Sequence, residues 1–246
     1  MGFNNPSWTW SELEATLSGR RGRDGRAPAS PSWNAGGDGP AWSRKRQPFQ
    51  ATRTRVAGEV PYAELHCHSN FSFLDGASHP EELVETAAAL GLEAVALTDH
   101  NGFYGVVRFA EAAREAQMPT VFGSELTLTD DRHLVLLADG PQGYARLSRA
   151  ISLGQLAGEK EAPRFTLDGV ADEATGSCWV LTGCRKGTVP AALVDSGPAA
   201  ARRELERLIA AFGRDRVLVE LWDHGDPLDS ARNDALAELA HRVGVE

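Results

Sequence analysis

The 246-residue sequence lacks the features that mark several common classes of protein. It has no apolar run near the roughly 20 residues that a membrane-spanning helix needs, so we expect no membrane association. Its start, MGFNNPSWTW, contains neither a basic segment nor an apolar one, and we therefore expect a cytoplasmic protein without a secretory signal. The GxxxxGKS/T phosphate loop, the GxSxG nucleophile elbow and the GxGxxG dinucleotide fingerprint are also missing, so those three enzyme classes are not indicated.

Cysteine is scarce in this chain. Cys67, Cys178 and Cys184 make an odd number and show no paired spacing. In a cytoplasmic chain we expect such residues to ligate a metal or to be buried, rather than to form a disulfide.

Positive charge is concentrated at the beginning of the chain. Residues 1–58 contain nine Lys or Arg against four Asp or Glu, whereas residues 59–246 contain 16 against 30. Gly, Pro, Ser and Arg are frequent in the first stretch, which predicts a largely disordered leader with one short helix at Trp8–Leu17. The basic cluster Arg44–Arg46 is either a nucleic-acid contact or part of a solvated tail. The acidic remainder indicates a small substrate, or a duplex that is held elsewhere.

Residues 59–246 have the pattern of one globular domain. Apolar residues make up 42% of the sequence, which is enough for a core. Pro80 opens a helix with an acidic first turn, and Gly91 ends it. Further helices are expected at 104–117, 141–156, 199–212 and 229–243. Strands are expected at 62–65, 94–97, 119–122, 126–128, 133–138, 179–181 and 217–221. This alternation predicts an α/β fold with a largely parallel sheet or barrel.

The most informative residues are His66 and His68, in LHCHS, at the carboxyl end of the first expected strand. Side chains two residues apart on a strand point to the same face, so both imidazoles can reach one metal ion. The carboxyl ends of parallel strands share one rim, where further ligands would meet. Five more candidates lie near expected strand ends: Asp75 in SFLDG, His100 in ALTDHN, Glu125 in FGSEL, His133 in HLVLLA and Cys184 in LTGC.

Nitrogen, oxygen and a single thiolate form a ligand set that suits Zn²⁺, with Mn²⁺ or Fe²⁺ as alternatives at the more oxygen-rich positions. The set is too large for one tetrahedral ion, which predicts two or three ions that share carboxylate bridges. Such clusters activate water for phosphoryl hydrolysis. Three candidates also have a structural explanation: His133 as a cap at the start of a strand, Cys184 as a buried apolar side chain and Asp75 as a turn residue.

Other polar residues near these motifs have less definite roles. Asp99 is expected to orient His100 or to close the loop rather than to bind metal. Arg185 and Lys186, in GCRKG, either hold a phosphate or form a solvated turn. The remaining histidines are expected to be structural or exposed: His79, His224 and His241.

Six sequence blocks together resemble a known family. They are LHCHSNFSFLDGAS, ALTDHNGFYGVVRFAEAA, FGSELTL, HLVLLA, LTGCRKG and ELWDHG, within residues 60–246. In this order and spacing they resemble the PHP domain of bacterial C-family DNA polymerases, most of all its error-prone branch. The resemblance implies a distorted (β/α)7 barrel with up to nine metal-ligand positions. Those carried by matching motifs are His66, His68, Asp75, His100, Glu125, His133 and Cys184.

The chain also departs from the pattern of that family. The family's last two ligands, an Asp and a His two residues apart, and the strand that closes its barrel would lie beyond Glu246. The polymerase core of the family is likewise absent from this chain. We therefore expect an open barrel and weakened binding of Zn²⁺ or Mn²⁺. DNA would be held through the missing polymerase domains, with damage-tolerance or replisome proteins as further partners.

Three functions agree with these residues. The first is the amino-terminal part of an error-prone DNA polymerase for DNA repair and damage-tolerant replication, with a metal-dependent 3′–5′ exonuclease or phosphoesterase site. The second is a stand-alone phosphoesterase of the histidinol-phosphatase type, which the lack of the final Asp-x-His disfavours. The third is a scaffold whose metal site only stabilises the fold, and it is compatible with the first.

Overall fold

The computed structural model describes residues 49–58 and 61–246. The helix expected at Trp8–Leu17 and most of the leader lie outside the described residues. The chain divides into two compact units, Met1–Gln50 and Ala51–Glu246. The second unit carries every helix and strand described below.

A six-stranded sheet forms the centre of the second unit, with its strands in chain order. β1, β2 and β3 run parallel, β4 runs antiparallel to both neighbours, and β5 and β6 are parallel again. β1 and β6 are the two edges of an open, curled sheet, and the curl brings His66, after β1, within 2.8 Å of Glu220, after β6. The strands are β1 (Ala63–Glu64), β2 (Ala94–Leu97), β3 (Thr120–Thr127), β4 (His133–Ala138), β5 (Cys178–Leu181) and β6 (Val217–Leu218).

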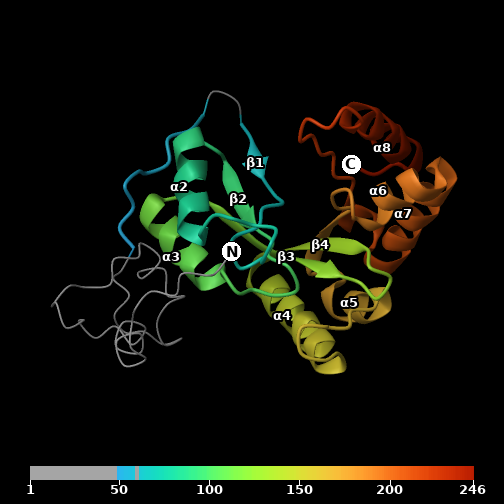
Figure 1. The fold of residues 1–246 in the computed structure, drawn as a ribbon, viewed down its shortest axis with the longest axis horizontal. Coiled ribbons are helices and arrows are strands. Elements are labelled where there is room, and N and C mark those ends of the chain that lie inside the picture. The colour runs from blue at the N-terminus through green and yellow to red at the C-terminus, as the bar shows by residue number, and fades with distance from the viewer. Residues whose placement is uncertain (1–48, 59–60) are drawn as a thin grey trace, which may run out of the picture. The chain divides into compact units, whose positions relative to one another are not determined.

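Helices flank this sheet, as expected for an α/β fold. They are α2 (Pro80–Leu90), α3 (Val106–Ala116), α4 (Gly140–Ala157), α5 (Leu167–Ala174), α6 (Thr188–Ser196), α7 (Pro198–Phe212) and α8 (Asp229–Val243), with a short 3₁₀ helix, η2, at Arg214–Arg216. α2 and α3 lie side by side next to β1 and β2, whereas α7 packs against α5, α6 and α8 (Figure 1). No helix in the described part of the chain combines the length and the apolarity that a bilayer crossing requires.

Two of these helices, α5 and α6, were not predicted from the sequence. They span only 8 and 9 residues, and each contains a residue of low helix propensity, Gly169 in α5 and Pro190 in α6. Pro190 is the third residue of α6, where its missing N–H has no intrahelical partner to lose. Both helices are stabilised by burial of their apolar faces rather than by local propensity.

The main difference from the predicted parallel arrangement is at β4. β3 and β4 are joined by a short turn in which Asp131 has a φ of 61° and donates its N–H to Leu128. A parallel connection needs about a dozen residues or more, so this turn makes β4 antiparallel. The two strands predicted on either side of Glu125 are one strand, β3. Gly123 lets it continue, because a Cβ there would lie 2.5 Å from the backbone oxygen of Leu136.

The core lies on both faces of β4. Leu134 and Leu136 face a large apolar cluster that includes residues of α4, α5 and α7. Val135 and Leu137 face a smaller cluster on the opposite side of the sheet. All four side chains are at most 4% exposed, which explains why the sequence HLVLLA shows an apolar run instead of an alternating pattern.

We expect Leu136→Ala to lower the free energy of unfolding by about 2–5 kcal/mol, because it removes a fully buried side chain and leaves a cavity. Urea unfolding followed by circular dichroism measures the change. The matched control is Leu156→Ala, which truncates a leucine of α4 that is 83% exposed and should change the free energy by less than about 0.5 kcal/mol. Equal losses in the two variants would contradict this placement of the core.

Candidate metal centre

The four histidines predicted as ligands lie next to one another. His66 and His68 follow β1, with their ring centroids 5.2 Å apart. The His68 ring lies 4.5 Å from that of His100, which follows β2. The His100 ring in turn lies 5.3 Å from that of His133, at the start of β4. The four rings form a continuous row at one rim of the sheet.

The carboxylate of Glu125, on β3, is at the centre of this row. Its Oε2 atom lies 3.6 Å from Nε2 of His66, 3.1 Å from Nε2 of His68 and 3.4 Å from Nδ1 of His100. Its Oε1 atom lies 2.9 Å from Nδ1 of His133. The side chain is 1% exposed, so four imidazole nitrogens converge on one carboxylate that solvent barely reaches.

Asp75 reaches the same row from the loop that follows β1. Its Oδ2 atom lies 2.5 Å from Nδ1 of His68 and 3.0 Å from Nε2 of His100. Gly76 allows the loop to return to the strand, because a Cβ at this position would lie 2.0 Å from the backbone oxygen of Ser69. The loop therefore brings Asp75 between two histidines from different strands.

Asp99 fixes this loop from below the site. Its side chain is 1% exposed and accepts hydrogen bonds from the backbone N–H and the hydroxyl of Ser69 and from the hydroxyl of Ser72. The Ser72 oxygen in turn accepts the backbone N–H of His100. The prediction that Asp99 closes the loop is confirmed, and the same hydrogen bonds set the position of His100.

His133 belongs to the site although it begins its strand. β4 is antiparallel to β3 and β5, so its amino end lies at the rim where those two strands end. The backbone N–H of His133 donates to the carbonyl of Lys186, in the loop after β5, at 2.9 Å. The reversal of β4 thus adds an imidazole to a rim that is otherwise built from the carboxyl ends of strands.

Six of the seven predicted ligands form three groups in which all ligand atoms lie within 4.8 Å of one another. The groups are His66, His68 and Glu125; His68, Asp75 and His100; and His100, Glu125 and His133. Cys184 lies outside them, with its Sγ atom 3.9 Å from Oε1 of Glu125. Burial, together with the charges of Glu125 and Glu220, raises the pKa of the Cys184 thiol to about 11, so this thiol is protonated in the metal-free protein.

A cavity of about 840 Å³ lies over the histidine row, and all seven predicted ligands line it. Sequence reasoning missed one neighbour of the cluster, Glu220, whose Oε1 atom lies 2.8 Å from Nδ1 of His66 and whose Oε2 atom is buried without a hydrogen-bond partner. His224, predicted to be structural or exposed, is exposed but also lines the cavity, with its ring 4.1 Å from that of Trp222. Both residues lie in the ELWDHG block, which follows β6. A position after a strand is the signal that identified other candidates, so the same signal could have identified these two.

The residues of the cluster determine one another's protonation. Burial alone would raise the pKa of Glu125, but the imidazoles of His133, His66 and His68 around it hold that pKa well below its usual range. Burial lowers the pKa of His66, but the carboxylates of Glu125 and Glu220 outweigh it and raise that pKa to about 10. The metal-free cluster therefore holds an ionised Glu125 beside a protonated His66.

One atom of the cluster shows that these residues fit a divalent cation. Nε2 of His68 is buried and makes no hydrogen bond, although it lies 3.1 Å from Oε2 of Glu125. A buried nitrogen without a partner is costly, and a cation shared with the carboxylate would satisfy it. The donor set of imidazole nitrogens and carboxylate oxygens is one that Zn²⁺ and Mn²⁺ accept.

The sheet and this cluster together define the class of the protein. The chain belongs to the PHP domain family, whose pattern matches residues 64–224. The match begins at the last residue of β1 and ends at His224, so it contains all seven predicted ligands and Glu220.

Among known proteins, error-prone DNA polymerases are similar to this chain. That of Mycobacterium bovis is 51% identical over 257 residues, which cover 100% of this chain and 23% of that protein. That of Nocardia farcinica is 45% identical over 300 residues, which cover 100% of this chain and 26% of that protein. The chain therefore spans only a minor part of the length of these relatives.

Solved structures support the fold. An amidohydrolase from Chromobacterium violaceum aligns with a TM-score of 0.52 and 21% identity, over 75% of this chain and 84% of that chain. A protein from Bifidobacterium adolescentis, predicted to be a metal-dependent phosphoesterase, aligns with a TM-score of 0.51 and 20% identity, over 76% and 86% of the two chains. At these identities the likeness concerns the fold alone.

We expect the metal-free protein to lose stability as the pH rises from about 6.5 to 8.5. The pKa of His66 is raised from 6.5 to about 10 on folding, so the folded state retains a proton that the unfolded state releases in this window. One such proton lowers the free energy of unfolding by up to about 1.4 kcal/mol per pH unit. Urea unfolding in EDTA at a series of pH values measures the slope.

The variant that tests this slope is His66→Gln, in which the decline should be shallower. His241→Gln removes an exposed histidine of α8 and should leave the slope as it is. Zn²⁺ should reverse the trend, because metal ligands must lose their protons to bind. A flat profile in the metal-free wild-type protein would show that His66 does not hold the extra proton.

Proposed function

We propose that this chain is the amino-terminal portion of an error-prone DNA-directed DNA polymerase and that its histidine row is a metal-dependent phosphodiesterase site. The observation that carries the second part is the convergence of four imidazoles on the buried Glu125, with Asp75 beside two of them. The first part is supported by the 51% identity to the Mycobacterium bovis error-prone DNA polymerase over the whole of this chain. DNA synthesis itself belongs, in this proposal, to regions outside this chain.

Two or three cations are assigned to the three ligand groups. His66, His68 and Glu125 would hold one, and His100, Glu125 and His133 would hold another, with Glu125 common to both groups. The third group, in which Asp75 joins His68 and His100, would hold an additional ion. Zn²⁺ or Mn²⁺ is favoured, since both accept mixed nitrogen and oxygen ligands. Cys184 is the remaining predicted ligand, and its Sγ atom, 3.9 Å from Oε1 of Glu125, would be an additional donor beside these groups.

The chemistry proposed for the site is hydrolysis of a phosphodiester, as in a 3′–5′ exonuclease. A bound cation would lower the pKa of a coordinated water and polarise a phosphoryl oxygen. The protein's part is to hold the ligands still. Glu220 fixes the ring of His66 through its Nδ1 atom, and Asp99 fixes the loop of Asp75 through Ser69 and Ser72. Outer contacts of this kind orient ligands and raise their basicity.

The cellular role proposed for the whole protein is DNA repair and damage-tolerant replication in the cytoplasm. DNA is the partner of the whole polymerase in this proposal, with other damage-tolerance or replisome proteins beside it. This chain's contribution is its metal site, because residues 59–246 carry 16 basic against 30 acidic side chains, a balance that disfavours binding of a duplex.

A scaffold role is the second candidate, and one observation favours it. The cluster draws side chains from the ends of β1 and β2, from β3 and from the start of β4 onto one carboxylate. A cation held there would cross-link four segments of the sheet, and its binding free energy would add to the stability of the fold. The third candidate is a stand-alone phosphoesterase, which would use the same metal site without being part of a polymerase.

Hydrolysis of bis(p-nitrophenyl) phosphate by the purified chain in Mn²⁺ or Zn²⁺ tests the phosphodiesterase. We expect metal-dependent turnover that falls by more than about 100-fold in His68→Ala, since even the outer partners of metal ligands contribute about 10- to 100-fold. His241→Ala is the matched control, because it removes a histidine that lies outside the cavity. Activity that persists in His68→Ala would contradict the assignment of the histidine row as the phosphodiesterase site.

The same preparation separates the enzyme from the scaffold. Metal analysis and thermal unfolding with and without EDTA report whether the cluster binds ions and whether these stabilise the fold. Bound metal and a raised Tm without turnover would support the scaffold. The absence of bound metal in the wild-type protein would remove both proposals for the site.

A further inference from the structure

Two basic side chains, from Arg185 and Lys186, lie in the wall of the metal cavity. Arg185 and Lys186 are the only Lys or Arg residues among the described residues that line it, and both side chains are exposed. Three carboxylates line the same cavity, from Glu64, Asp75 and Glu125, and that of Glu220 lies against His66. Two basic side chains at this place are the natural contact for an anionic group that enters the cavity.

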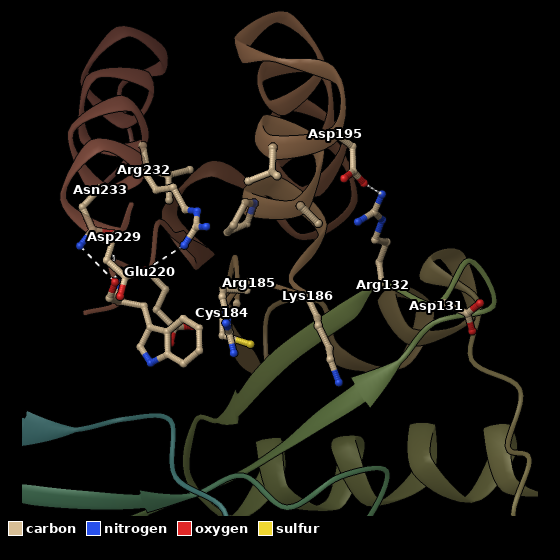
Figure 2. A pocket seen from close by; sticks show the side chains of 16 residues that line it. Asp131, Arg132, Cys184, Arg185, Lys186, Asp195, Glu220, Asp229, Arg232 and Asn233 are labelled. Carbon is tan, nitrogen blue, oxygen red and sulfur yellow. Dashed lines mark hydrogen bonds and ion pairs between the residues drawn. The ribbon is translucent and has the colours of Figure 1, made fainter. Parts of the chain in front are cut away.

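Arg185 and Lys186 differ from the neighbouring arginines in their contacts. Figure 2 shows Arg132 directed at Asp195, with an ion pair of 2.5 Å, and Arg232 pairs with Asp229 at 2.9 Å. The guanidinium of Arg185 instead packs over the ring of Trp222, 5.0 Å from its centroid. In the described part of the chain neither Arg185 nor Lys186 forms an ion pair, so their charges are available to a ligand.

The backbone that carries them is fixed to the metal centre. The carbonyl of Lys186 accepts the backbone N–H of His133, and the carbonyl of Cys184 accepts that of Gly187 at 2.7 Å. Gly183 has a φ of 84°, and a Cβ at Gly187 would lie 2.1 Å from the oxygen of Thr182, so the turn is compact. The two cations therefore stand at a set position beside the cluster rather than on a loose loop.

A second pocket of about 300 Å³ (Figure 2) shares part of its lining with the metal cavity. Cys184, Arg185, Lys186 and Trp222 line both spaces, so they form the wall between them. The second pocket also has an apolar side, formed by Pro190 and Ala191 of α6 and Leu236 of α8. An apolar wall next to an aromatic ring suits a flat ring such as a nucleobase.

We propose that Arg185 and Lys186 bind the phosphate adjacent to the scissile one in a single-stranded nucleic acid, with a base in the pocket between α6 and α8. This inference rests on the proposed function, because it places the scissile phosphate at the histidine row. It also narrows the substrate class to a chain of at least two nucleotides. A phosphomonoester would place its only phosphate at the histidine row and leave both the apolar pocket and the two basic side chains unused.

Fluorescence anisotropy with a short single-stranded oligothymidylate tests whether Arg185 and Lys186 bind phosphate. Its linkages are phosphorothioates, which slow hydrolysis, and titrations of the full chain in Mn²⁺ are repeated at several salt concentrations. For a single strand, each phosphate that loses its basic partners lowers the slope of log Kd against log salt by about 0.7. Because Arg185 and Lys186 share one phosphate in this proposal, the double variant Arg185→Gln, Lys186→Gln should lower the slope by about 0.7 and raise Kd at least about fivefold at low salt.

The matched control is Lys160→Gln, Arg203→Gln, which removes the same charge at exposed sites outside both pockets. Basic residues of the first 58 positions contribute equally to every variant. The control should retain the wild-type slope, and equal effects of the two double variants would overturn the proposal. A 5′-phosphorylated thymidine dinucleotide, which carries two phosphates, should compete better than thymidine monophosphate against the wild-type chain. Equal competition would overturn it as well, since the site would then recognise a single phosphate.

The failure of this proposal can be told from failure of the proposed function. Turnover of bis(p-nitrophenyl) phosphate by the wild-type chain reports on the metal centre and needs no adjacent phosphate. If the wild-type chain turns over this substrate but the variant Arg185→Gln, Lys186→Gln keeps the wild-type salt slope, the metal centre is supported and the phosphate contact is contradicted. If that variant has a lower salt slope but the wild-type chain shows no turnover, the phosphate contact is supported and the hydrolysis is contradicted.

Discussion

The buried carboxylate of Glu125 is the constraint on which the rest of the structure depends. A charge that is 1% exposed is costly to bury unless partners surround it, and here β1, β2 and β4 each bring imidazole to it. The strands can supply these partners only if the rim is built with His66 and His68 in register with Glu125 and with β4 reversed. The order of the sheet and the chemistry of the site are therefore consequences of the same requirement.

The sequence was sufficient to predict the α/β class and most elements, since strands and helices of ordinary length have clear apolar periods. It also predicted six residues that the structure brings within ligand distance of one another, because His66 and His68 share a strand face and the others stand near strand ends. The reversal of β4 was not predicted, since a continuous apolar run is the same in both directions. Glu220 was missed because β1 and β6, adjacent only through the curl of the sheet, are far apart in the chain.

Charge is divided unevenly over this rim. Carboxylates dominate the cluster and require cations or protonated imidazoles as their partners, as the raised pKa of His66 shows. Arg185 and Lys186 stand apart from those carboxylates, with Arg185 held over an aromatic ring instead. A site divided in this way separates two tasks that would otherwise conflict: the attraction of metal ions, which needs negative charge, and the attraction of a phosphate chain, which needs positive charge.

The contact between His66 and Glu220 has a consequence for the edges of the sheet. β1 and β6 share no backbone hydrogen bonds, so the contact of 2.8 Å between Nδ1 of His66 and Oε1 of Glu220 connects the two edges through side chains. Loss of the proton would remove the charge of His66 and weaken this pair, whereas it would leave a backbone ladder unchanged. Binding at the histidine row also acts on His66, so it would change how firmly these two outermost strands are held together.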